Sequence, residues 1–72
     1  MRKYLIILEK TKTGFSAYVP DLPGCIATGK TKQQVEKLIF DAIEFHLEGL
    51  KEYKQPIPKS ETEAYSVLVS VR

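Results

Sequence analysis

The chain has 72 residues, of which 43% are hydrophobic and 28% are charged, and its formal net charge is +2 at pH 7. This length allows one small domain with a small core, so we expect oligomerisation to add to its stability. The charge is too small to indicate a nucleic-acid partner by itself, and no apolar run is long enough to span a membrane. The single cysteine excludes an internal disulfide and favours a cytoplasmic location.

The first 29 residues predict three strands joined by short connections. Residues 3–10 form the first strand, whose centre is apolar on both faces, which is typical of an interior strand or of one with a face covered by a partner. A hairpin loop follows and ends at Gly14, which suits the left-handed backbone region. Residues 15–19 and 25–29 form the second and third strands, with Tyr18 on the opposite face from Ala17.

Local signals predict a rigid turn before the third strand and a helix cap after it. The residue before Pro20 is restricted to extended backbone, and the order Pro-Gly is that of a type II turn, in which glycine accepts a positive φ. A threonine followed three residues later by glutamine is the pattern of a capping box. The turn and cap residues are Pro20, Asp21, Pro23, Gly24, Thr31 and Gln34.

A long helix is predicted over residues 32–53, because apolar residues recur in it every three or four positions as a single stripe. Pro56 and Pro58 end the helix. Residues 64–72 predict a last strand, with Tyr65 and three valines alternating on one face.

These elements predict one two-layer α+β domain, residues 1–72, in the order βββαβ. The first three strands form an antiparallel meander, and the helix brings the last strand back parallel to the first. A right-handed crossover then gives the sheet order 3-2-1-4, with one long helix on one face.

The segment Pro20-Asp21-Leu22-Pro23-Gly24-Cys25, followed by Gly29-Lys30-Thr31, resembles the HicB family, the antitoxins of HicA–HicB toxin–antitoxin pairs. The resemblance implies a partial ribonuclease-H-like fold. It also implies a partner, a HicA-type toxin that cleaves mRNA, which the antitoxin binds and neutralises. Many HicB proteins carry a further DNA-binding module that this sequence does not show, so we expect no DNA binding from this chain alone. The alternative is an oligomeric binding or regulatory module without a toxin.

The sequence does not favour catalysis, and we expect no catalytic residue, cofactor or metal. A two-metal nuclease needs several carboxylates around ions about 4 Å apart. The centre of the first strand and the whole last strand lack acidic residues, and Asp41 and Glu44 lie on the solvated side of the helix. An active nuclease would lose metal-dependent RNA cleavage in Asp41→Ala. His46 lies in the apolar stripe and is expected to pack on the sheet, and Cys25 is expected to be a small buried side chain.

Binding surfaces are predicted where apolar groups remain uncovered. The candidates on the bare face of the sheet and at the edges of the helical stripe are Leu5, Ile7, Tyr18, Phe40, Phe45 and Leu68, although the strand register could instead place the sheet residues inside, and the phenylalanines could seal the core. They predict a homodimer or a higher even assembly. A basic rim around the helix N-terminus comprises Lys10, Lys12, Lys30, Lys32 and Arg72; it is either solvated or in contact with an acidic partner.

Overall fold

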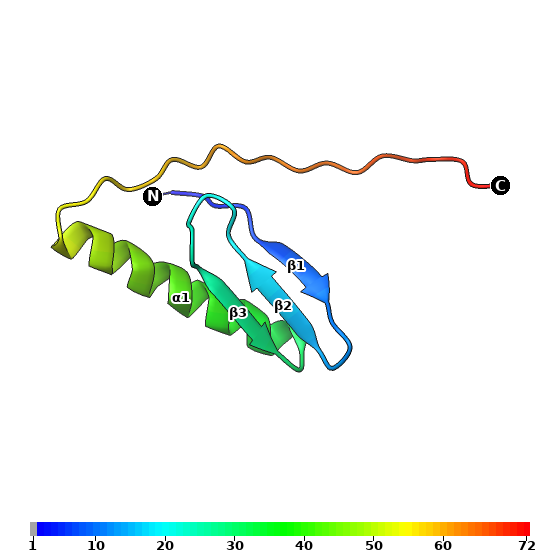
Figure 1. The fold of residues 1–72 in the computed structure, drawn as a ribbon, viewed down its shortest axis with the longest axis horizontal. Coiled ribbons are helices and arrows are strands. Elements are labelled where there is room, and N and C mark those ends of the chain that lie inside the picture. Colours follow the sequence, from blue (N-terminus) through cyan, green and yellow to red (C-terminus); the bar gives the residue numbers. More distant parts are fainter. Residues whose placement is uncertain (1) are drawn as a thin grey trace.

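The computed structural model describes residues 2–72 and has two layers, a small antiparallel sheet and one helix (Figure 1). Strands β1 (Ile7–Lys10), β2 (Phe15–Tyr18) and β3 (Ile26–Gly29) are followed by helix α1 (Lys32–Glu52). The sheet order is β1-β2-β3, with both pairs antiparallel. The predicted meander and long helix are confirmed, but the first strand begins four residues later than its apolar pattern indicated.

The predicted last strand is not formed within the single chain. Residues 55–72, all of them described, belong to no helix or strand, and Figure 1 shows them as an extended segment that leaves the domain. The radius of gyration is 14.5 Å, against about 11 Å for a compact chain of this length. The sheet order 3-2-1-4 is therefore not observed, because none of residues 2–72 pairs with residues 64–72 as a strand.

The turn between β2 and β3 is built by its own backbone. The N–H of Cys25 donates to the carbonyl of Leu22 at 3.1 Å, which closes a turn around Pro23 and Gly24. Gly24 has φ 84°, as position i+2 of the predicted type II turn requires. A second bond, from the N–H of Val19 to the carbonyl of Cys25 at 3.1 Å, joins the two ends of the turn.

Gly14 closes the first hairpin for a reason other than the predicted one. Its backbone is not in the left-handed region, since Gly24 is the glycine with positive φ among the described residues. Instead, a Cβ at position 14 would overlap the carbonyl oxygen of Gly29. Glycine is needed here because two backbone segments approach closely, which strand and turn patterns do not reveal.

Both ends of α1 are capped. The hydroxyl of Thr31 accepts from the N–H of Gln34 at 3.1 Å, while the Gln34 side chain accepts from the N–H of Lys30 at 2.9 Å, one residue before the expected partner in a capping box. At the other end, Gln55 N–H donates to the Leu50 carbonyl at 2.8 Å. With Lys54 at φ 56°, this is a Schellman motif in which lysine occupies the left-handed position.

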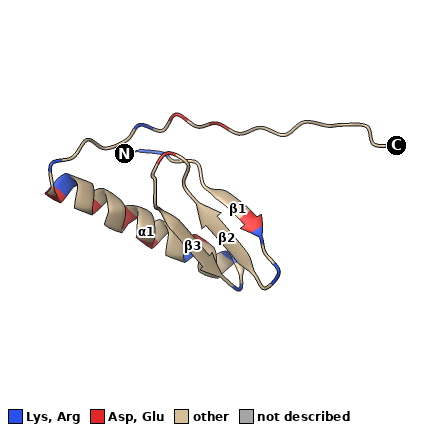
Figure 2. Cartoon of the chain, viewed as in Figure 1, with Lys and Arg blue, Asp and Glu red and all other residues tan. Residues whose placement is uncertain are grey.

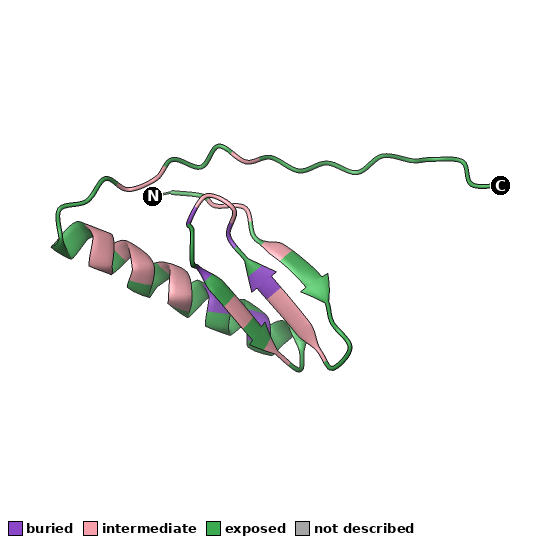
Figure 3. Ribbon diagram, viewed as in Figure 1, coloured by how far each residue is buried: buried purple, intermediate pink, exposed green. Residues whose placement is uncertain are grey.

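The core lies between α1 and only part of the sheet. Alternate residues of the strands, such as Ala17 and Ala27, share the face toward the helix, and the buried core residues are Ala17, Val19, Leu22, Cys25, Val35 and Ile39 (Figure 3). Among the described elements, α1 packs against β2 and β3 but not against β1. The helix is thus displaced toward β3, and the helix side of β1 is left open.

Candidate interaction surface

The sheet face opposite the helix carries an apolar row that none of the described helices or strands covers. Ile7 pairs with Tyr18, and Tyr18 pairs with Ile26, so that the three side chains lie side by side across the sheet. Tyr18 is 41% exposed and Ile26 64% exposed. The structure places Ile7 and Tyr18 on the bare face, as the sequence predicted. It adds Ile26, which the prediction did not include, although Ile26 faces the side of the strand opposite to Ala27.

A second apolar surface lies on the helix side of the sheet, between β1 and α1. A cavity of about 330 Å³ is lined there mainly by Ile6, Leu8, Val35, Ile39 and Phe40. Ile6, Leu8 and Phe40 remain between 38% and 59% exposed, because α1 does not reach over β1. We call this surface the β1 groove.

The two helical phenylalanines do not seal the core. Phe40 borders the β1 groove, and Phe45 is 80% exposed. Of the two alternatives that the sequence left open, their exposure favours a patch available to another polypeptide.

The segment after the helix is tied to the domain at two points. The Tyr4 hydroxyl donates to the Pro58 carbonyl at 2.5 Å. The Asp21 carboxylate accepts from the hydroxyl of Thr62 at 2.8 Å and from the N–H groups of Thr62 and Glu61 at 3.1 and 3.0 Å. These bonds, that of the Thr62 hydroxyl first, hold the pKa of Asp21 below its ordinary 3.8. Asp21 was predicted as a turn residue, and its role as an anchor 41 residues away in sequence was not foreseen.

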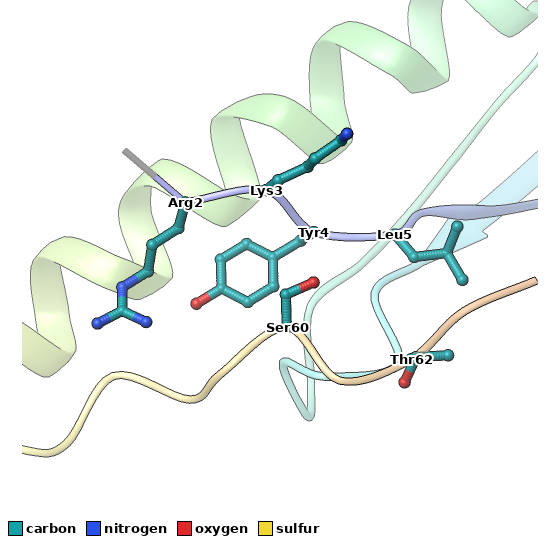
Figure 4. A pocket seen from close by; sticks show the side chains of 6 residues that line it. All are labelled: Arg2, Lys3, Tyr4, Leu5, Ser60 and Thr62. Atoms are coloured by element: carbon teal, nitrogen blue, oxygen red, sulfur yellow. The ribbon is translucent and has the colours of Figure 1, made fainter.

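Between these anchors lies a cavity of about 480 Å³, whose lining includes Tyr4, Leu5, Ser60 and Thr62 (Figure 4). Leu5 lies before β1, which begins only at Ile7, and it lines this cavity beside the returning segment.

Beyond the anchors, residues 63–72 form what we call the tail. Its large apolar side chains are all exposed, from 67% to 102%: Tyr65, Val67, Leu68, Val69 and Val71. Leu68 was predicted to lie with Ile7 and Tyr18, but in the single chain it projects from the tail into solvent. Within the part of the chain that the structure describes, this alternating apolar segment has no strand partner.

Four of the five residues predicted for the basic rim lie at one end of the domain. Lys10, Lys12, Lys30 and Lys32 come from the hairpin end of the sheet and the start of α1 (Figure 2), and the Lys32 ammonium lies 5.8 Å from the ring centroid of Phe15. Arg72 is not part of this rim, because the C-terminal end lies at the tip of the tail (Figure 1).

The residues tested for chemistry have structural positions. Cys25 is buried, as predicted, and burial raises the pKa of its thiol. His46 is half-buried on the helix, and exposed Asp41 lies 3.6 Å from the Lys37 ammonium. Within residues 2–72, no cluster of three or more His, Cys, Asp or Glu side chains is arranged to hold a metal ion. In the same residues no helix is long and apolar enough to cross a membrane.

The fold and its surfaces define a class of protein, a small two-layer α+β domain whose exposed apolar surfaces suit the binding of another polypeptide. Residues 4–69 match the family described as the HicB_like antitoxin of bacterial toxin-antitoxin system. Because this match spans more than half of the chain, the protein belongs to the HicB-like antitoxin family, as its turn and cap motifs suggested.

Relatives and a solved structure agree with this assignment. The chain is 40% identical over 57 residues to an uncharacterized 14.9 kDa protein of Haemophilus phage HP1, covering 79% of this chain but only 43% of the phage protein. It is 38% identical over 66 residues to the UPF0150 protein Ta0767 of Thermoplasma acidophilum, covering 90% of this chain and 96% of that relative. A chain of the HicA3 and HicB3 toxin-antitoxin complex superposes with a TM-score of 0.69 at 33% identity, covering 83% of this chain and 70% of the other.

Proposed function

We propose that this protein is a non-catalytic antitoxin that binds a HicA-type toxin and neutralises it by covering its active site or RNA-binding surface. The observation that carries the proposal is the uncovered row of Ile7, Tyr18 and Ile26 on a chain that belongs to an antitoxin family. A structural neighbour from a HicA3–HicB3 complex supports a toxin as the partner. Such a toxin acts on mRNA, so the complex would function in the cytoplasm.

The binding surface can be tested with Tyr18→Asp. Tyr18 points away from the core and is 41% exposed, so the substitution leaves the core intact while placing a charge in the apolar row. We expect a loss of toxin affinity of about 100-fold, equivalent to about 2.8 kcal/mol, as for an anchoring aromatic residue at an interface. The measurement is calorimetric titration with the HicA-type toxin that this proposal predicts to be encoded beside the gene, together with rescue of growth on co-expression.

Tyr53→Asp is the matched control, because Tyr53 is 75% exposed at the C-terminal end of α1, away from the apolar row. It should bind the toxin as the unsubstituted chain does. Equal affinities for all three proteins would contradict the proposed surface. Absence of any physical association with such a neighbour would contradict the antitoxin function itself.

A second candidate function is an oligomeric binding or regulatory module that acts without a toxin. It is favoured by the archaeal relative, 96% of whose length is matched by this one domain. The neighbouring gene distinguishes the two functions. An antitoxin requires an adjacent gene for a small toxin, and the antitoxin must relieve the growth arrest that this toxin causes. For either function we propose no DNA binding by this chain, and nanomolar binding to its own promoter in a gel-shift experiment would contradict that.

A further inference from the structure

We propose that two copies of this chain exchange their tails, each tail adding as a fourth strand to the free edge of β1 in the other copy. The inference goes beyond toxin binding, since it concerns the tail and the β1 edge and not the apolar row on the bare face. It commits the β1 groove to one occupant, the tail of a second copy.

The composition of the tail requires a partner. Residues 64–71 carry no charged side chain, and their apolar residues alternate as in a strand. Five large apolar side chains in the tail are at least 67% exposed. Strand sequences of this kind pair with other strand edges when left uncovered, and natural edges are usually protected by charges or proline. Residues 64–71 have neither protection.

The acceptor is the outer edge of β1. In the order β1-β2-β3, β1 has a neighbour on one side only, so its other backbone groups are free to pair. Ile6 and Leu8 line the groove on the helix side of this edge, whereas Ile7 lies on the bare side. An added strand with Val67, Val69 and Val71 on one face would place these valines into the groove and Leu68 beside Ile7.

Register argues against the tail pairing with β1 of its own chain. Thr62 lines the same cavity as Leu5 and is tied to Asp21. A tail running on from there beside its own strand would reach the end of β1, Lys10, at about Val67, because both strands advance about 3.3 Å per residue. Leu68, Val69 and Val71 would then extend past the sheet and stay in water.

A tail from another copy is not bound by that register. Its anchors belong to the other domain, so residues 67–71 can be placed beside residues 6–10 and the groove is filled. Reciprocal exchange gives two equivalent contacts around a two-fold axis, the most common arrangement of a homodimer. The exchanged dimer has two four-stranded sheets, and Val67, Val69 and Val71 of each tail are covered.

The first experiment compares Val69→Asp with Ser66→Asp by light scattering of the full chain. The unsubstituted protein should have twice the mass of one 8.2 kDa chain at micromolar concentration. Val69→Asp should raise the dissociation constant by about 100-fold or more, because each dimer loses two buried valines. Ser66→Asp adds the same charge to the tail, before the paired residues and without removing an apolar group, and should remain dimeric. A monomeric unsubstituted chain, or a dimer indifferent to Val69→Asp, would overturn the proposal.

The second experiment shows which chain each tail occupies. In a Cys25→Ala background, chains with a spin label at Ser70→Cys are mixed with ¹⁵N-labelled chains that carry no label. If the tails are exchanged, the amide signals of Ile7 to Lys10 in the ¹⁵N-labelled chains should broaden. As a control, a spin label at Lys51→Cys on α1 should leave those signals sharp. Broadening seen only when one chain carries both the spin label and ¹⁵N would assign the β1 edge to the chain's own tail and refute exchange. Broadening seen only after a HicA-type protein is added would assign that edge to the toxin and also refute exchange.

Discussion

At the scale of single residues, Asp21 determines where the segment after the helix is held. Its carboxylate accepts three hydrogen bonds from Glu61 and Thr62, and these bonds lower its pKa. A group whose pKa is lowered by folding stabilises the docked state above its ordinary pKa, and this contribution is lost as the pH falls through the lowered value. Docking of residues 61–62 should therefore be intact at pH 5–7.

We expect the amide signals of Glu61 and Thr62 to move toward random-coil positions below pH 3.8, the ordinary pKa of the carboxyl group, in an NMR titration of the full chain. Asp21→Asn keeps an acceptor oxygen but removes the charge, so its Thr62 signal should be less displaced from random coil at pH 7 and independent of pH below 5. A Thr62 signal in the unsubstituted chain that stays constant from pH 7 to pH 2 would contradict the anchor.

Residues with local roles were predictable from the sequence, whereas those acting across the fold were not. Pro23-Gly24 forms the expected turn because the conformations of proline and glycine are set within four residues. The anchor at Asp21 and the contact of Gly14 with Gly29 join positions 15 to 41 residues apart, and residue type alone does not encode which distant backbone will lie there.

At the scale of elements, the helix was predicted almost to the residue and the strands less well. The stripe and the Thr31 cap define α1 from within its own sequence. A strand ends where its neighbour ends, so β1 is limited to the four residues that oppose β2, even though apolar residues precede it. The offset of α1 toward β3, which opens the β1 groove, depends on packing and leaves no periodic signal.

The C-terminal end of α1 offers a prediction of stability at this scale. Lys54 occupies a left-handed conformation, φ 56°, which costs a residue with a Cβ about 1–2 kcal/mol and glycine far less. After the entropy that glycine loses on folding, Lys54→Gly should stabilise the domain by about 0.5–1 kcal/mol and raise Tm by about 3–6 °C. The control Lys51→Gly, inside the helix, should destabilise it by about 1 kcal/mol. Calorimetric scans in which the two variants shift Tm in the same direction would contradict the Schellman motif.

At the scale of the whole molecule, the sequence predicted a last strand that the single chain does not form. Its apolar residues alternate as in a strand, but pairing is a property of two strands. The sequence pattern indicates that residues 64–72 can pair as a strand. It does not indicate whether the neighbouring strand belongs to the same chain or to another copy. The same ambiguity explains why Leu68 and Arg72 were grouped with residues from which they are distant.

Strand exchange couples folding to association, and this gives the last prediction. If the tail folds only on a second copy, unfolding separates the chains, and Tm must rise with protein concentration. A tenfold increase should raise Tm by about 4–5 °C, since it shifts the free energy by about 1.4 kcal/mol against an unfolding entropy of about 0.3 kcal/mol/K for two chains of this size. A chain ending at Glu63 retains both anchors and should unfold at a lower temperature that is independent of concentration. Scanning calorimetry over a hundredfold range of concentration measures both, and a full-length Tm that does not change over that range would show that the tail is satisfied within its own chain.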